Sequence, residues 1–342
     1  RGLGDVYKRQ VFHVKHTSGA EGNPMTNEVP VYDKAPKRAA FDGPDEPEIE
    51  EPDDFKGASV RVPRTLPGPS EPRIIAVANQ KGGVGKTTTT VNLATALAMS
   101  GLRTLVIDID PQGNASTALG VHHDVGTPGT YEVLLEGEKI TLVAQMSPES
   151  PLLDVVPATI DLSGAELQLV TQSKRESCLR KALKEYLDTH DVDYVFIDCP
   201  PSLGLLTLNA LVAADEVMLP IQCEYYALEG VQQLMRTVTA VKQAFNPDLS
   251  IETIVMTMYD ARTNLSQQVT AEVREHFSGE TLDTVIPRSV RVSEAPSYTR
   301  SVLTYEPHSS GARAYRDAAA EFAHRHACLL YTSDAADEED SV

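Results

Sequence analysis

The residues from Gln80 to Thr88 read QKGGVGKTT and have the types and spacing of a loop that binds phosphate. Glycines let the backbone turn tightly, so that its N–H groups can face phosphate oxygens, and the following helix adds its positive dipole end. Lys86 is placed to reach the terminal phosphates, and the Thr87 hydroxyl suits Mg²⁺. The other residues expected to contact the nucleotide are Gly82, Gly83, Val84, Gly85 and Thr88.

Acidic side chains follow two apolar runs downstream. Asp108 and Asp110 lie in VIDIDPQGN, and Asp198 lies in VFIDCPPS. Carboxylates at strand ends beside a phosphate loop commonly hold Mg²⁺ and the attacking water. The alternative, that each merely caps a strand, is strongest for Asp108, for which we favour a supporting role. The segments expected to sense the terminal phosphate contain Pro111, Gln112, Gly113, Asn114, Pro200 and Pro201.

The elements that must position these residues alternate along the chain from Arg73 onward. Predicted strands span 74–78, 104–109, 152–156, 194–198, 216–220 and 251–258, with a shorter one at 284–286. Predicted helices span 86–100, 176–188, 205–213, 228–245, 265–277 and 311–326. Nearly all-apolar strands, each followed by a helix, predict an α/β fold with a mostly parallel sheet covered by helices on both faces. Ligands of such sheets bind at the carboxyl ends of the strands.

Composition sets limits on function. The 342 residues carry a formal net charge of −19. Residues 73–327 alone hold 31 acids and 20 bases, so any nucleic-acid contact must come from a local basic patch. The four cysteines form no C-x-x-C pair, which argues against a metal cage or a disulfide framework and fits a reducing cytoplasm. No apolar run approaches the ~20 residues of a membrane span, and no signal peptide is visible.

The two ends look foreign to the domain. Arg1–Gln10 and Cys328–Asp337 can be encoded by sequences that resemble sequencing adapters, so we expect residues 1–10 and 328–342 to be adapter-derived tails. Residues 11–72 are rich in Pro, Gly and acids without apolar periodicity, which predicts a disordered N-terminal arm. The ordered domain is therefore expected to span residues 73–327.

The phosphate loop has an unusual start, because Gln80 replaces the first glycine and Lys81 follows it. This K-G-G-x-G-K-T form resembles the deviant Walker A loop of the ParA/MinD/Fe-protein superfamily of P-loop NTPases. The resemblance implies that Lys81 reaches across a dimer to the partner's nucleotide, as an arginine finger does. It also implies that Asp110 positions water and that Asp198 lies near Mg²⁺. The alternative for Lys81 is a solvated loop lysine.

Other motifs narrow the resemblance to the ParA/Soj branch over about residues 73–327. They include IDIDPQGNAS, IDCPPSLGLLTLNAL, EYYALEGV and IPRSVRVSEAPS. The resemblance places the segments around Met256–Asp260 and Pro287 beside the adenine, with Met256 and Pro287 as the residues expected to bind ATP. It also matches Arg262 and Arg291 to arginines implicated in sequence-independent DNA binding, with internal ion pairs as the alternative. The next candidates for DNA contact are Arg274, Arg288 and Arg300.

Other branches of the superfamily fit less well. An Fe-protein needs cluster-ligating cysteines, whereas Cys199 and Cys223 look like buried thiols. A tyrosine autokinase needs a tyrosine-rich tail, and Tyr331 alone does not supply one. A MinD-like membrane-associated ATPase needs a C-terminal amphipathic helix, which residues 324–327 do not show. A nucleotide-gated scaffold without turnover would not need Asp110 and Lys81.

The resemblance thus implies a slow, Mg²⁺-dependent ATPase that works in chromosome or plasmid partition. Its ATP-bound sandwich dimer would bind double-stranded DNA nonspecifically, and a ParB-like centromere-binding protein would stimulate hydrolysis. Such a protein would be cytoplasmic and nucleoid-associated, with no membrane partner.

Overall fold

The computed structural model describes residues 62–224 and 227–328. The expected tail at residues 1–10, the arm from 11 to 61 and the tail from 329 onward lie outside this part of the chain. Residues 62–72 belong to the predicted disordered arm, yet they lie against the domain. The backbone N–H of Thr65 donates to the Ser100 carbonyl at 2.9 Å, the Arg64 guanidinium pairs with Asp193, and Leu66 packs against the core. Ordered packing therefore begins before the predicted boundary at Arg73.

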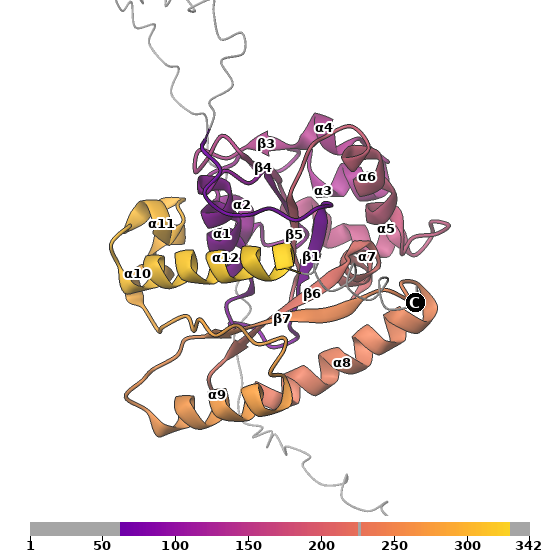
Figure 1. Cartoon of the computed structure of the whole chain (residues 1–342). Helices are drawn as coiled ribbons and strands as arrows, with labels where there is room; N and C mark the ends of the chain where they lie inside the picture. The colour runs from indigo at the N-terminus through magenta and orange to yellow at the C-terminus, as the bar shows by residue number, and fades with distance from the viewer. Residues whose placement is uncertain (1–61, 225–226, 329–342) are drawn as a thin grey trace, which may run out of the picture. The chain divides into compact units, whose positions relative to one another are not determined.

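The core of the described chain is a seven-stranded sheet in the order β3-β4-β2-β5-β1-β6-β7 (Figure 1). All neighbouring strands are parallel except β3, which pairs antiparallel with β4. The strands are β1 (Arg73–Val77), β2 (Thr104–Asp108), β3 (Gln145–Met146), β4 (Leu153–Val156), β5 (Tyr194–Asp198), β6 (Glu216–Gln222) and β7 (Ser250–Thr257). The predicted mostly parallel α/β fold is confirmed.

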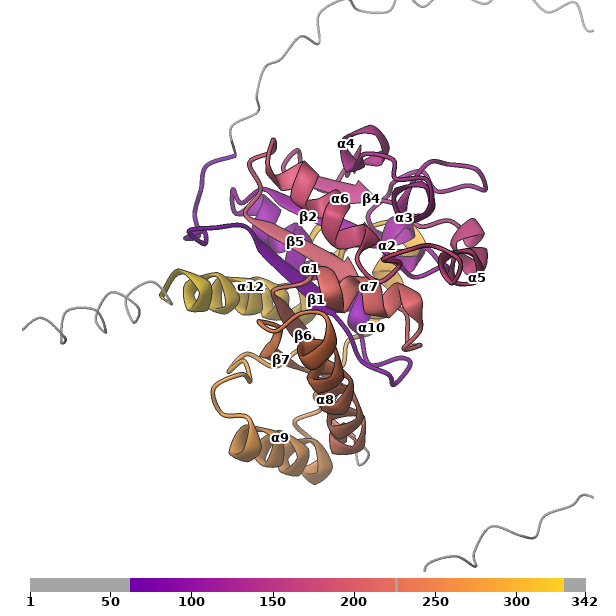
Figure 2. The same ribbon diagram turned by 90° about the vertical axis from the view of Figure 1, so that its right-hand side faces the viewer.

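Helices cover both faces of this sheet, as Figures 1 and 2 show from two directions. The α-helices are α1 (Lys86–Met99), α2 (Asn114–Ala118), α3 (Thr130–Leu135), α4 (Ile140–Val143), α5 (Ala165–Leu169), α6 (Cys178–Leu187), α7 (Leu205–Ala213), α8 (Ala227–Ala244), α9 (Asn264–His276), α10 (Val290–Glu294), α11 (Val302–Tyr305) and α12 (Ser310–Cys328). Two 3-10 helices, η1 (Ile160–Gly164) and η2 (Ala295–Tyr298), connect them.

The alternation of strand side chains divides the core into two layers. On one face Ile75, Val77 and Phe196 pack with residues of α1, α2 and α12. On the other face Ala76 and Ile197 pack with residues of α6, α7, α8 and α9. Strands buried on both faces must be apolar at nearly every position, which is why they could be recognised from sequence.

The predicted strand at residues 284–286 is wrong. This segment runs beside the end of β7, where the Ile286 N–H donates to the Met256 carbonyl at 2.8 Å, but only isolated bridges form at Thr281 and Pro287. Asp283 and Thr284 instead donate their backbone N–H groups to the Glu321 carboxylate in α12. The sequence also gave no sign of β3 or of the short helices around the sheet's carboxyl edge.

Candidate nucleotide site

The phosphate loop connects β1 to α1 at the carboxyl edge of the sheet, as the sequence predicts. Gly83 and Gly85 have φ angles of 75° and 90°, a left-handed conformation that glycine adopts without a Cβ penalty. Gly85 is the N-cap residue of α1, so the chain enters the helix directly from this turn. The Lys86 side chain is nearly buried, and its Nζ lies 3.4 Å from the carbonyl oxygen of Lys81.

Two buried polar residues, Asn79 and Thr257, hold this loop in place. Asn79 donates from its amide to the Pro220 carbonyl at 2.8 Å and accepts from the backbone N–H of Lys81 at 3.0 Å. Thr257, at the end of β7, donates to the Val84 carbonyl at 2.7 Å. The Val84 side chain is buried. The loop is therefore anchored to β6 and β7, which lie far away in the sequence.

Asp198 lies beneath the start of α1 and is fully buried. The hydroxyls of Thr87 and Thr90 donate to its two carboxylate oxygens at 2.7 and 3.1 Å. Burial raises the pKa of Asp198, and these hydrogen bonds oppose the rise. Burial also lowers the pKa of Lys86, against the attraction of the Asp198 charge.

Asp108 and Asp110 have different surroundings. Asp108 is fully buried and accepts from both the backbone N–H and the hydroxyl of Ser116, at 2.8 and 2.7 Å. Burial and the neighbouring Asp198 charge raise its pKa. These contacts fit a residue that holds the start of α2. Asp110 instead lines the cavity described below and accepts from the backbone N–H of Gln112 at 3.0 Å.

Thr87 and Asp198 offer a donor set that fits Mg²⁺, since a hydroxyl and carboxylate oxygens are the hard ligands this ion takes. Asp108 and Asp198 are register partners on adjacent strands, so two buried carboxyl groups lie side by side. Lys86 is the ammonium whose charge acts on Asp198. Added positive charge at this point would favour the ionised carboxylates.

A cavity of about 770 Å³ opens above these groups. Its lining includes Gly82, Gly83, Gly85, Lys86, Thr87 and Thr88 of the phosphate loop, Asp110, Pro111, Gln112 and Asn114 after β2, and Pro200 and Pro201 after β5. The structure thus brings three separate predicted segments together. Gly113 does not line the cavity; its φ is 61°, and a Cβ there would lie 2.9 Å from the Ala158 carbonyl oxygen.

The cavity lining also contains residues that were not named individually as nucleotide contacts, although Met258 falls within the segment expected beside the adenine. Glu166, Met258, Ala295, Pro296 and Arg300 all contribute to its lining. Arg300 was considered only as a reserve candidate for DNA contact. Glu166 comes from α5, whereas Ala295, Pro296 and Arg300 come from η2 and the loop after it. These elements meet the phosphate loop only through tertiary packing, which no local pattern of residues predicts.

Met256 lies outside the cavity lining. Its side chain is fully buried in the core layer of α7, α8 and α9. Met258 lines the cavity instead, because a left-handed φ of 52° after the end of β7 turns its side chain out of the strand's alternation. Pro287 is half-buried, pairs with Tyr259 in an isolated bridge and does not line the cavity.

Lys81 lies beside the cavity rather than in its lining. Its Nζ is 3.2 Å from a carboxylate oxygen of Glu224, which follows β6 in the same chain. The side chains of Lys81 and Glu224 are 35% and 45% exposed. The lysine is therefore near the surface and is held by an ion pair within its own chain.

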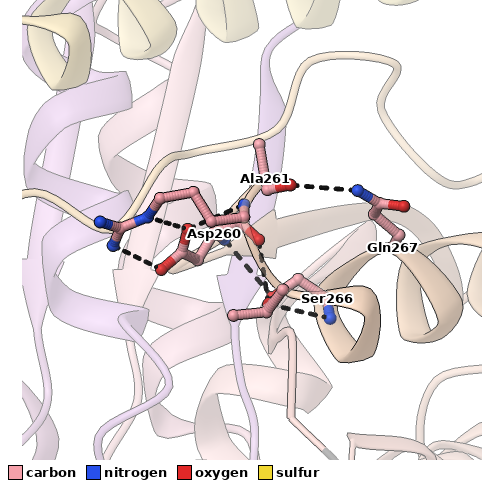
Figure 3. A network of polar contacts seen from close by, with 6 residues as sticks. Asp260, Ala261, Ser266 and Gln267 are labelled. Carbon is pink, nitrogen blue, oxygen red and sulfur yellow. Dashed lines mark hydrogen bonds and ion pairs between the residues drawn. The ribbon is translucent and has the colours of Figure 1, made fainter.

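Arg262 lies in the loop between β7 and α9. Figure 3 shows the polar contacts of Asp260, Ala261, Ser266 and Gln267 around this loop. The Arg262 guanidinium makes two hydrogen bonds with the Asp260 carboxylate, at 2.9 and 2.8 Å, and its backbone N–H makes a third. These bonds lower the pKa of Asp260 to about 2. Gln267 in α9 donates to the Ala261 carbonyl and fixes the loop from the other side. The Arg262 side chain remains 88% exposed.

Arg291 lies in the short helix α10, not in the loop expected from sequence. It pairs with Glu294 one turn later at 3.0 Å, and its side chain is 54% exposed. Both candidate DNA-binding arginines thus have the internal ion pairs that were the alternative interpretation. Both also keep part of the guanidinium at the surface, where a phosphate could compete.

Within the described residues, no helix combines the length and the apolar character needed to cross a membrane.

Comparison with known proteins places these features in a family. Residues 72–251 match the model of an AAA domain family. The chain is 51% identical over 243 residues to the chromosome partitioning protein ParA of Myxococcus xanthus, covering 71% of this chain and 85% of that protein. It is also 51% identical over 252 residues to the sporulation initiation inhibitor protein Soj of Bacillus subtilis, covering 73% and 98% of the two chains.

Solved structures agree on the fold. A cobyrinic acid a,c-diamide synthase from Mycobacterium smegmatis, with bound ATP analogue and magnesium, matches at 40% identity with a TM-score of 0.62, covering 72% of this chain and 92% of the other. The cell division ATPase MinD of Pyrococcus furiosus matches at 27% identity with a TM-score of 0.59, covering 73% and 98%. Together with the deviant phosphate loop and the carboxylates that surround it, these matches show that the chain belongs to the ParA/Soj family of chromosome-partitioning ATPases.

Proposed function

We propose that this protein is an ATP-driven partition ATPase that forms a sandwich dimer with ATP, binds DNA without sequence preference and releases it after hydrolysis. The observation that carries the proposal is the cavity in which Lys86, Thr87 and Asp110 converge, with the partly exposed Lys81 beside it. The 51% identity to ParA and Soj proteins over most of their length supports the same role.

Each site residue has a different proposed role in phosphoryl transfer. Lys86 binds the terminal phosphates, and Thr87 with Asp198 would hold Mg²⁺, which neutralises charge on the phosphate oxygens. Within the described residues, the Asp110 carboxylate receives one hydrogen bond, at Oδ1, so its second oxygen is available to orient a water. Lys81 of the second protomer supplies a cation in trans, as an arginine finger does.

DNA binding by a net-negative chain depends on a few positioned cations. Arg262 and Arg291 are the proposed contacts, since guanidinium groups suit phosphate oxygens. Each protomer would bind DNA weakly through these two arginines. Dimerisation joins two such surfaces in one rigid dimer and so raises its effective affinity for DNA. ATP can therefore control DNA binding without altering either arginine.

The test is a comparison of ATP turnover under four conditions: protein alone, with random duplex DNA, with a ParB-like centromere-binding protein, and with both. We expect slow turnover alone and strong stimulation only with both, in keeping with a cytoplasmic protein that acts on the nucleoid. No stimulation in any mixture would contradict the proposal. ATP-dependent sedimentation with anionic lipid vesicles, and not with DNA, would indicate a MinD-like role instead.

A further inference from the structure

The backbone and the side chain of Lys81 are held in different ways. Its backbone N–H is fixed by the buried Asn79, which is itself anchored to β6. Its Nζ contacts the Glu224 carboxylate at 3.2 Å. Lys81 could therefore change its partner by rotating side-chain bonds alone, without disturbing the phosphate loop.

Glu224 has other contacts that should hold it in place when Lys81 moves away. Its backbone N–H donates to the Gln222 carbonyl at 2.8 Å, directly after β6. The amide of Gln222 also donates to the Glu224 carboxylate, and a guanidinium nitrogen of Arg288 lies 3.8 Å from it. Because the carboxylate is partly exposed and has these other neighbours, loss of Lys81 does not leave an isolated buried charge.

We propose that Glu224 is a positioning residue that holds Lys81 against its own chain and thereby sets how readily the ATP dimer forms. The inference rests on the proposed function, in which Lys81 acts across the dimer. Lys81 cannot contact Glu224 closely and also reach the partner's nucleotide, so each protomer must break this ion pair when the sandwich closes. Glu224 thus opposes dimer formation until nucleotide phosphates offer the lysine a stronger partner.

The expected change in the dimerisation constant follows from the solvent exposure of the Lys81–Glu224 ion pair. A solvent-exposed ion pair contributes little, roughly a twofold change in an equilibrium constant. Two pairs break when one dimer forms, so the dimerisation constant should change roughly fourfold on removing the carboxylate charge. Salt screens exposed pairs, so the difference should shrink as ionic strength rises.

The experiment compares the full chain with Glu224→Gln by analytical ultracentrifugation in a slowly hydrolysed ATP analogue with Mg²⁺. Glu224→Gln should strengthen dimerisation roughly fourfold at low salt, and Glu224→Ala should do the same because it also removes the charge. The matched control is Glu185→Gln, which removes the charge from an exposed ion pair with Lys181 on α6. The control should dimerise like the wild type, and all variants should keep the wild-type melting temperature.

Two outcomes separate this inference from the function on which it rests. If Lys81→Ala dimerises normally, Lys81 does not act across the dimer. The proposed role of Glu224 is then wrong as well. If Lys81→Ala stays monomeric while both Glu224 variants dimerise no better than Glu185→Gln, only the role of Glu224 is wrong. Weaker dimerisation of Glu224→Gln would likewise overturn it, since that result would mean that the carboxylate stabilises the dimer.

Discussion

Lys86 and Lys81 belong to one loop but have different environments. Lys86 is nearly buried next to Asp198, and burial lowers its pKa. Lys81 is partly exposed and pairs with Glu224. A buried ammonium at the phosphate turn suits permanent contact with the chain's own nucleotide, whereas a surface ammonium can be exchanged between partners. The difference between the two lysines lies in what surrounds them and not in their residue type.

Asp110→Ala should keep ATP binding and dimerisation but lose hydrolysis. Asp110 lines the cavity, and among the described residues its carboxylate makes no hydrogen bond to the phosphate loop. The main loss should therefore be the orientation of the attacking water. Loss of such a group lowers turnover by about 100-fold or more. Phosphate release and binding of a fluorescent ATP analogue would measure both properties. Turnover near the wild-type rate would show that another group orients the water.

Lys81→Ala should still bind ATP through Lys86 and the loop backbone, but it should fail to form the ATP dimer. The Asn79 anchor acts on the backbone of residue 81, so the loop should keep its shape. Light scattering with ATP would report the oligomeric state. Lys181→Ala, which removes an exposed lysine from α6, is the control and should dimerise.

At the scale of elements, the segment formed by α10 and η2 carries both a proposed DNA contact and residues that line the cavity. Arg291 lies in α10, and the next element, η2, places Ala295 and Pro296 in the cavity lining. The loop that carries Arg262 follows β7 directly, just after Met258. The proposed DNA contacts are therefore only a few residues away from positions that would meet the nucleotide.

Arg262→Glu and Arg291→Glu should each abolish nonspecific DNA binding at moderate salt while ATP binding and dimerisation persist. Each arginine is paired with an acid, so reversal adds a repulsive charge beside Asp260 or Glu294. Every lost phosphate contact should also reduce the slope of log affinity against log salt by about 0.9.

Fluorescence anisotropy with random duplex DNA and ATP would measure this DNA binding. Lys181→Glu gives the same change of charge on α6 and should bind like the wild type. If the double Arg262→Glu/Arg291→Glu variant still binds DNA, the surface lies elsewhere, and Arg274, Arg288 and Arg300 become the next candidates.

Phe322→Ala should destabilise the domain by about 3–5 kcal/mol, because it opens a cavity where α12 meets the sheet. Phe322 is fully buried, with its ring centroid 5.4 Å from that of Tyr194 in β5 and 6.0 Å from that of Phe196. Urea unfolding followed by circular dichroism would measure the loss. Leu167→Ala on α5 is the control, since that side chain is 80% exposed and should change stability little.

For the whole molecule, the cavity couples nucleotide binding to stability because its walls come from distant parts of the chain. ATP with Mg²⁺ at about 100 times its dissociation constant should stabilise the folded state by about 2.7 kcal/mol. Differential scanning fluorimetry would show this as a rise in melting temperature. Lys86→Ala should lose most of the rise, and an unchanged rise in that variant would place the phosphates outside this cavity.

The sequence by itself determined the fold class and the residues of the proposed phosphate-binding half of the site. Strands buried on both faces are apolar throughout, so their positions could be predicted to within a few residues. The phosphate loop, its flanking strand and the start of α1 are contiguous in sequence, so their motif was sufficient. Asp110 and Asp198 could be placed beside the phosphate loop because parallel strands end at one edge of the sheet.

Only the tertiary structure decided which distant residues complete the site. Thr257 meets the carbonyl of Val84, and Glu224 meets Lys81, across sequence separations of 173 and 143 residues. The choice of Met258 over Met256 depends on one left-handed residue after β7, which reverses the direction expected from strand alternation. Contacts of this kind depend on how β6, β7 and η2 pack around the phosphate loop, and no local pattern of residues encodes that packing.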